Sequence, residues 1–103
     1  MMKDLTIIIP AYNEEKRILP TLQHIQEYAE ASPIAIHVIV VDDGSTDRTC
    51  AVVEHAGFRH VRLIRQKQNQ GKFAAFSVGA KIATGEWVLL YDADGATPIT
   101  VLD

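Results

Sequence analysis

The stretch "IHVIVVDDGSTD", residues 36–47, joins an apolar run to a polar turn, and it decides the fold. The first six residues are β-branched except for one histidine, and a short run of this kind bounded by turn residues predicts a strand. The run is nearly continuous rather than alternating, which is typical of a parallel strand buried on both faces. The aspartates, the glycine and the hydroxyl residues that follow predict a turn that leads into a helix.

Three more runs have the same character, at residues 5–9, 60–64 and 87–91. Segments with helical spacing of apolar residues separate them, covering residues 13–29, 47–55 and 71–84. The alternation of strand and helix predicts an α/β fold with a parallel sheet and helices on both faces. If the fourth strand pairs on the far side of the first from the second, the strand order is 3-2-1-4.

Capping residues predict where the helices begin and end. We expect Asn13 to cap the first helix and Ser45 or Thr46 to cap the second, which should stop before Gly57. The third helix should end at Gly85. Its spacing predicts that one side carries Phe73, Phe76, Ala80 and Ala83.

Composition fits one small soluble domain of 103 residues, with 48% hydrophobic residues and a net charge of -3. No block of Lys and Arg offers a surface for nucleic acid, and "FRHVRLIRQKQNQGK" is better interpreted as a strand with a solvated end. The single cysteine, Cys50, excludes an internal disulfide and fits a reducing compartment. Neither a signal peptide nor an apolar run of bilayer length is present, so we expect a cytoplasmic location.

The last residues predict the start of another helix, with Thr97 as its N-cap and Pro98 at the first helical position. About one and a half turns remain, too few for a helix that is stable alone. We therefore expect residues 1–103 to be the front part of a longer protein.

Polar residues follow three of the four predicted strands, at the edge where doubly wound sheets bind ligands. They are Tyr12, Asn13, Glu14, Asp42, Asp43, Asp92 and Asp94. Carboxylates about 4 Å apart repel by about 4 kcal/mol near a protein surface, so several in one crevice predict a cation. A hard divalent ion, Mg or Mn, is the simplest candidate, and it would favour a ligand with a diphosphate.

Simpler interpretations remain open for each motif taken alone. An Asp-x-Asp pair often only accepts hydrogen bonds from nearby backbone N–H groups, and "DDGSTD" could be a turn with a helix cap. An EF-hand loop starting at Asp92 fails, because Ala96 and Thr97 occupy its fifth and sixth positions. "NQGKF" matches neither the Walker pattern nor the dinucleotide glycine fingerprint.

Three motifs in register, "IIIPAYNEE", "VIVVDDGSTDRT" and "NQGKFAAFSVGAKIATGEWVLLYDADGATP", cover most of the chain. Together they resemble the N-terminal half of the inverting family 2 glycosyltransferases, which have the Rossmann-like GT-A fold, a three-layer sandwich. The "NQGK" and "DADGATP" segments are most similar to the polyprenyl-phosphate branch, which includes dolichyl-phosphate glucosyltransferases.

The resemblance implies a nucleotide-sugar donor, with UDP-glucose or a similar UDP-linked sugar favoured, and a polyprenyl or dolichyl phosphate as acceptor. It implies Mg or Mn on the Asp-x-Asp motif, with Asp92 and Asp94 as ligands and Asp94 the more direct one. It places Asp42 at the base or ribose, Asp43 less directly beside it, and Lys72 near the phosphates or the base. The implied substrate-binding residues are Pro10, Ala11, Tyr12, Glu14, Asp42, Asp43, Lys72, Asp92 and Ala93.

The same resemblance places the general base in a second half of the protein, so no catalytic residue is predicted in this chain. That parent protein could associate with the cytoplasmic face of a membrane.

Other functions fit these sequence features less well. A receiver-like signalling module would carry its acidic pair after the first strand, and here the pair follows the second. A nucleotidyltransferase would need a glycine- and arginine-rich loop where "PAYNEEKR" stands. The remaining alternative is an inactive fragment that binds nucleotide without catalysis, or that self-associates through an uncovered strand edge.

Overall fold

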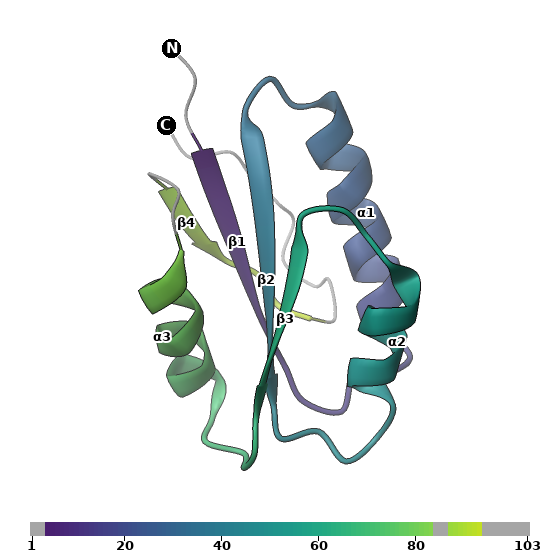
Figure 1. The fold of residues 1–103 in the computed structure, drawn as a ribbon, viewed down its shortest axis with the longest axis vertical. Coiled ribbons are helices and arrows are strands. Elements are labelled where there is room, and N and C mark those ends of the chain that lie inside the picture. The colour runs from purple at the N-terminus through teal and green to yellow at the C-terminus, as the bar shows by residue number, and fades with distance from the viewer. Residues whose placement is uncertain (1–3, 84–86, 94–103) are drawn as a thin grey trace.

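The computed structural model of the chain describes residues 4–83 and 87–93. Strands and helices alternate as the sequence predicts, and Figure 1 shows their arrangement. In chain order they are β1 (Asp4–Ala11), α1 (Ile18–Ala31), β2 (Ala35–Asp43), α2 (Thr49–Ala56), β3 (Val61–Gln66), α3 (Lys72–Ile82) and β4 (Trp87–Leu90). The helix expected at Thr97 and the stop expected at Gly85 lie outside the described residues.

The strands form one parallel sheet in the order β3-β2-β1-β4, which confirms the predicted order. β1 lies in the middle and pairs with β2 in register from Asp4 and Ala35 to Ala11 and Asp42. Helices α1 and α2 cover one face of the sheet and α3 covers the other (Figure 1). The turns after β1, β2 and β4 therefore emerge at one edge of the sheet.

Both faces of the sheet are buried, which explains why β1 and β2 show no polar alternation. On one face, Ile7 and Ile9 pack with Leu22 and Ile25 of α1. On the opposite face, Ile8 joins a smaller cluster that includes Ile39, Val41 and Ala75. Within the described residues, no helix combines the length and the apolar character that crossing a membrane requires.

Two predicted helix caps are wrong. α1 begins at Ile18, with Arg17 rather than Asn13 at the N-cap. Pro20 supplies a physical reason, because a proline is tolerated only in the first turn of a helix. α2 begins at Thr49, and neither Ser45 nor Thr46 caps it, since both take part in contacts with the turn after β1. Its predicted end is confirmed by Gly57, which has the left-handed φ of 61°.

The predicted apolar side of α3 is confirmed only in part, since Phe76 and Ala83 pack against the core but Phe73 and Ala80 are exposed. Phe73 is 75% exposed, and the fully buried positions of the helix are Ala75 and Gly79. Small residues are needed there because α3 lies close to the sheet. A Cβ added at Gly79 would stand 2.7 Å from Cγ2 of the buried Ile8.

Replacing Gly79 with alanine should destabilise the fold. The gain in helix propensity is about 1 kcal/mol. A Cβ 2.7 Å from a buried side chain places the overpacking cost in the upper part of the usual range, at about 2–3 kcal/mol, so we expect a net loss of about 1–2 kcal/mol. Urea unfolding measures the change, and Ser77→Ala on the exposed side of α3 is the matched control. A Gly79→Ala protein as stable as the wild type would contradict the close packing of α3 on β1.

Candidate functional site

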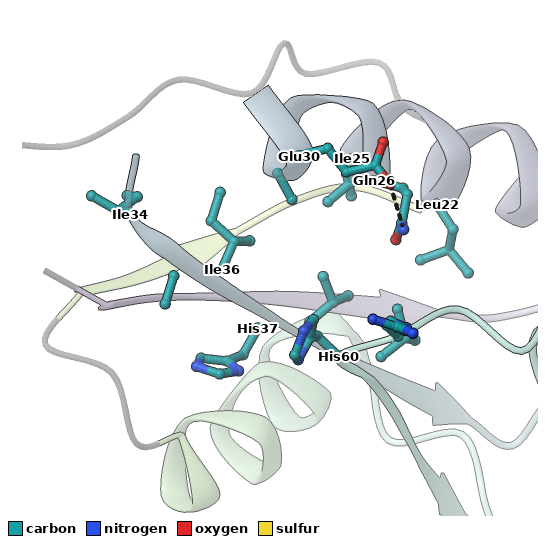
Figure 2. A pocket seen from close by; sticks show the side chains of 13 residues that line it. Leu22, Ile25, Gln26, Glu30, Ile34, Ile36, His37 and His60 are labelled. Atoms are coloured by element: carbon teal, nitrogen blue, oxygen red, sulfur yellow. Dashed lines mark hydrogen bonds between the residues drawn. The ribbon is translucent and has the colours of Figure 1, made fainter. Parts of the chain in front are cut away.

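Two cavities are candidates for a ligand site. The first, of about 320 Å³, lies between α1 and the beginnings of β2 and β3 (Figure 2). Its walls are mainly aliphatic side chains such as Leu22, Ile25 and Ile36, and the amide of Gln26 is already hydrogen-bonded to Glu30 at 3.3 Å. It lies at the amino ends of the strands, whereas ligands of doubly wound sheets bind at the carboxyl ends.

The second cavity, of about 350 Å³, lies at the carboxyl ends of β1, β2 and β4. We call it the carboxyl-end cavity. It has the size of a small-molecule site and several polar groups that converge on it, so it is the better candidate. Its lining residues are Pro10, Ala11, Tyr12, Glu14, Asp43, Asn69, Gly71, Lys72, Asp92 and Ala93.

The sequence predicted most of this lining. Of the predicted binding residues, Asp42 alone does not line the cavity, and Asp94 lies outside the described residues. The prediction omitted Asn69 and Gly71, although both stand just before Lys72 in the motif "NQGK". Phe73 does not line the cavity and points into solvent, so it leaves the approach to Lys72 open.

An ion pair crosses the carboxyl-end cavity. Nζ of Lys72, the first residue of α3, lies 2.5 Å from Oδ1 of Asp92, which follows β4. The two side chains are 48% and 33% exposed, so both remain within reach of a ligand. The contact joins the end of β4 to the beginning of α3.

Asp43 fixes the backbone that carries Lys72. Its carboxylate is buried and accepts hydrogen bonds from the backbone N–H groups of Gln70 and Gly71, each at 2.8 Å. Gly71 has a φ of 103°, a conformation that favours glycine. Charge-assisted bonds to a buried carboxylate are among the stronger hydrogen bonds, so this loop is held firmly against the end of β2.

The turn after β1 is fastened to the loop after β2 through Asn13. Its backbone N–H donates to Oγ of Ser45 at 2.8 Å, and its side-chain Oδ1 accepts from the N–H groups of Thr46 at 2.8 Å and Asp47 at 3.3 Å. Asn13 has a φ of 54°, which asparagine tolerates better than most residues. Asn13 is thus a bridge between two loops rather than a helix cap.

Asp47 completes this loop contact. It accepts hydrogen bonds from the N–H of Thr49 at 2.9 Å, from the Thr49 hydroxyl at 2.5 Å and from the N–H of Glu15 at 3.2 Å. Partial burial alone would raise the pKa of Asp47, but these hydrogen bonds outweigh it and lower the pKa below the usual range. The lowered pKa keeps the carboxylate ionised in mildly acidic solution.

Three of the carboxylates expected at one cleft, Glu14, Asp43 and Asp92, do line the carboxyl-end cavity, and each has a partner. Asp43 is satisfied by backbone N–H groups, Asp92 meets Lys72, and Oε1 of Glu14 lies 2.6 Å from the Arg17 guanidinium. Within residues 4–83 and 87–93, no three His, Cys, Asp or Glu side chains are placed to hold a metal ion together. The three cavity carboxylates are instead engaged by backbone N–H groups, a lysine and an arginine.

Asp42 does not line the cavity, and its contact with a base or ribose stays a prediction. It is 3% exposed, and its Oδ2 accepts a hydrogen bond from the N–H of Ser45 at 3.1 Å. Cys50 lies close enough to the Asp42 carboxylate for an electrostatic interaction. Burial, and secondarily the Asp42 carboxylate, raise the pKa of the Cys50 thiol to about 11.

Asp43→Asn should loosen the loop that precedes α3. An asparagine keeps one acceptor oxygen but turns an NH₂ group toward the second N–H, so we expect a loss of about 2 kcal/mol. Amide hydrogen exchange at Gln70 and Gly71 should become faster. Asp4→Asn, the same change at an exposed position, is the control and should leave both the stability and the exchange unchanged.

Cys50 should react slowly with iodoacetamide in the folded protein. Its pKa of about 11 leaves roughly 100-fold less thiolate at pH 8 than a pKa of 9 would. The folded state holds the thiol proton more tightly than the unfolded state, so stability is intact below about pH 9 and declines toward pH 11. The alkylation rate against pH, compared with that of the urea-unfolded chain, measures this shift. An inflection near pH 9 in the folded protein would contradict it.

Known proteins with similar sequences include two dolichyl-phosphate beta-glucosyltransferases. A dolichyl-phosphate beta-glucosyltransferase of Trichomonas vaginalis is 43% identical over 101 residues, covering 91% of this chain and 30% of the relative. The human dolichyl-phosphate beta-glucosyltransferase is 38% identical over 104 residues, covering 92% of this chain and 32% of the relative. The chain thus spans about 30% of the length of these relatives.

Solved structures share the fold. A mannosyltransferase from Pyrobaculum calidifontis in complex with GDP-Man and Mn2+ superposes with a TM-score of 0.83 at 33% identity, covering 96% of this chain and 30% of that one. TarS of S. aureus in complex with UDP-GlcNAc gives a TM-score of 0.77 at 31% identity, covering 88% of this chain and 26% of that one. Residues 6–102 match glycosyl transferase family 2, and the chain belongs to that family.

Proposed function

We propose that the protein to which this chain belongs is a glycosyltransferase, and that residues 1–103 are its donor-binding half. It would transfer a sugar from a nucleotide-diphosphate sugar to an acceptor. The observation that supports this most directly is the carboxyl-end cavity, which brings an exposed aromatic ring, a lysine and an aspartate to one opening.

The lysine side of the cavity suits a diphosphate. Lys72 carries a positive charge at the first position of α3, whose N-terminus has no side-chain cap and no acidic residue in its first turn. A helix N-terminus attracts anions, and a lysine placed there strengthens the attraction. The phosphates of a donor would therefore lie between the beginning of α3 and the end of β4.

The opposite side of the cavity suits a nucleoside. Tyr12 is 45% exposed at the cavity, and Pro10 and Ala11 form an apolar wall beside it. An exposed aromatic ring provides a surface on which a base can stack. A uracil base against Tyr12 would leave the diphosphate free to extend toward Lys72.

The described residues offer a divalent metal ion only part of the oxygen ligands that it needs. The carboxylate of Asp92 is a hard oxygen ligand at the cavity wall, and Mg or Mn is commonly held by one or two carboxylates together with substrate phosphates. Asp92 would therefore hold the ion together with Asp94. When bound, the metal would neutralise negative charge on the departing nucleoside diphosphate.

The relatives narrow the choice of substrates. Those with dolichyl-phosphate beta-glucosyltransferase in their names favour UDP-glucose or a similar UDP-linked donor and a dolichyl or polyprenyl phosphate acceptor. A lipid acceptor would bring the whole protein to the cytoplasmic face of a membrane. The general base and the acceptor contacts would come from the remainder of that protein.

Isothermal titration with UDP, with and without Mn2+, tests the proposal. UDP should bind more tightly with Mn2+, and Asp92→Asn should reduce that metal-dependent gain by about tenfold, because one charged oxygen ligand becomes a neutral amide. Asp4→Asn serves as the control for the loss of a carboxylate. UDP binding that is undetectable in the wild type, or unaffected by both Mn2+ and Asp92→Asn, would contradict the proposed function.

A further inference from the structure

We propose that Lys72 acts as a built-in counter-cation for Asp92, occupying its carboxylate until a diphosphate draws the lysine away. Metal binding at Asp92 would then depend on the nucleotide for a reason located in this chain. The inference rests on the proposed function, because it assigns a role to Lys72 in donor and metal binding.

The contact between the two residues is the first argument. Nζ of Lys72 lies 2.5 Å from Oδ1 of Asp92, close enough for a direct ion pair with no water between the two groups. A metal ion needs that oxygen, and a divalent cation beside an ammonium group meets strong repulsion. The lysine and the metal therefore compete for Asp92 whenever no anion is present between them.

The exposure of the pair makes the exchange feasible. Surface ion pairs contribute little net stability, and this one is exposed by 48% at Lys72 and 33% at Asp92. An incoming diphosphate can therefore outcompete it. The ammonium group would move from Oδ1 of Asp92 to a phosphate oxygen, and that carboxylate oxygen would become available to the metal.

The backbone beneath Lys72 is fixed while its side chain can move. Asp43 holds the N–H groups of Gln70 and Gly71, so the lysine stays at the cavity through both states. A lysine at a helix N-terminus is unfavourable by itself, because the helix dipole places partial positive charge there. An anionic partner offsets this unfavourable interaction in both states. Asp92 is that partner when no ligand is bound, and the diphosphate is that partner when the nucleotide is bound.

Titration of Mn2+ into the nucleotide-free protein tests this role. The concentration of unbound Mn2+ is measured by electron paramagnetic resonance. Lys72→Met removes the charge and keeps the length of the side chain, so Mn2+ should bind about three- to tenfold more tightly than in the wild type. Lys72→Arg keeps the charge and should bind Mn2+ as the wild type does. Lys67→Met removes an exposed lysine that does not line the cavity and should also have no effect.

UDP affinity separates this inference from the proposed function. In the presence of Mn2+, Lys72→Met should weaken UDP binding by about tenfold, since the phosphates lose their ammonium partner. If the wild type binds UDP with Mn2+ but Lys72→Met does not raise Mn2+ affinity in the absence of UDP, the counter-cation role is overturned and the proposed function stands. If the wild type binds no UDP, the proposed function and the inference both fail.

Discussion

The candidate site depends on one buried carboxylate that accepts two backbone hydrogen bonds. Asp43 ends β2 and binds the N–H groups of Gln70 and Gly71, residues that are remote in sequence and lie just before α3. Such bonds are strong because the acceptor is charged and shielded from water. They fix the beginning of α3 at the carboxyl edge of the sheet, and Lys72 reaches the cavity only because of that placement.

The hydrogen bonds around this edge give the site its electrostatic character. Asn13 fastens the turn after β1, Asp47 fastens the loop after β2, and the cavity carboxylates of Glu14, Asp43 and Asp92 each have a nearby partner. Among the described lining residues, Glu14, Asp43 and Asp92 outnumber the one lysine, so the wall remains net negative although each carboxylate has a partner. Lys72 lines the cavity, is partly exposed to solvent and forms an ion pair with Asp92. The cavity can therefore accept an anionic ligand that brings its own metal counter-ion.

Much of the fold could be predicted from sequence, because apolar runs and helical spacing report burial directly. The strand order followed from placing β4 beside β1, and the cavity lining followed from the rule that ligands bind at the carboxyl ends of strands. Those signals come from residue type and position along the chain alone.

The sequence does not show which contacts individual side chains make in the folded chain. Asn13 was expected to cap a helix that Pro20 places further along the chain, and its amide instead binds a loop more than thirty residues away. Sequence also does not distinguish the adjacent residues Asp42 and Asp43: Asp42 accepts a hydrogen bond within its own loop, and Asp43 lines the cavity, while the role of Asp42 at a base or ribose stays a prediction. The exposed Phe73 shows likewise that spacing alone does not identify the buried side of a short helix.

A crystal structure of the protein with UDP and Mn2+ bound tests the central claim most directly. The account predicts nucleotide in the carboxyl-end cavity, with its base against Tyr12 and its phosphates contacted by Lys72, and with Gln70 and Gly71 still bound to Asp43. Nucleotide bound in the apolar cavity beside α1, or phosphates held away from Lys72, would contradict it.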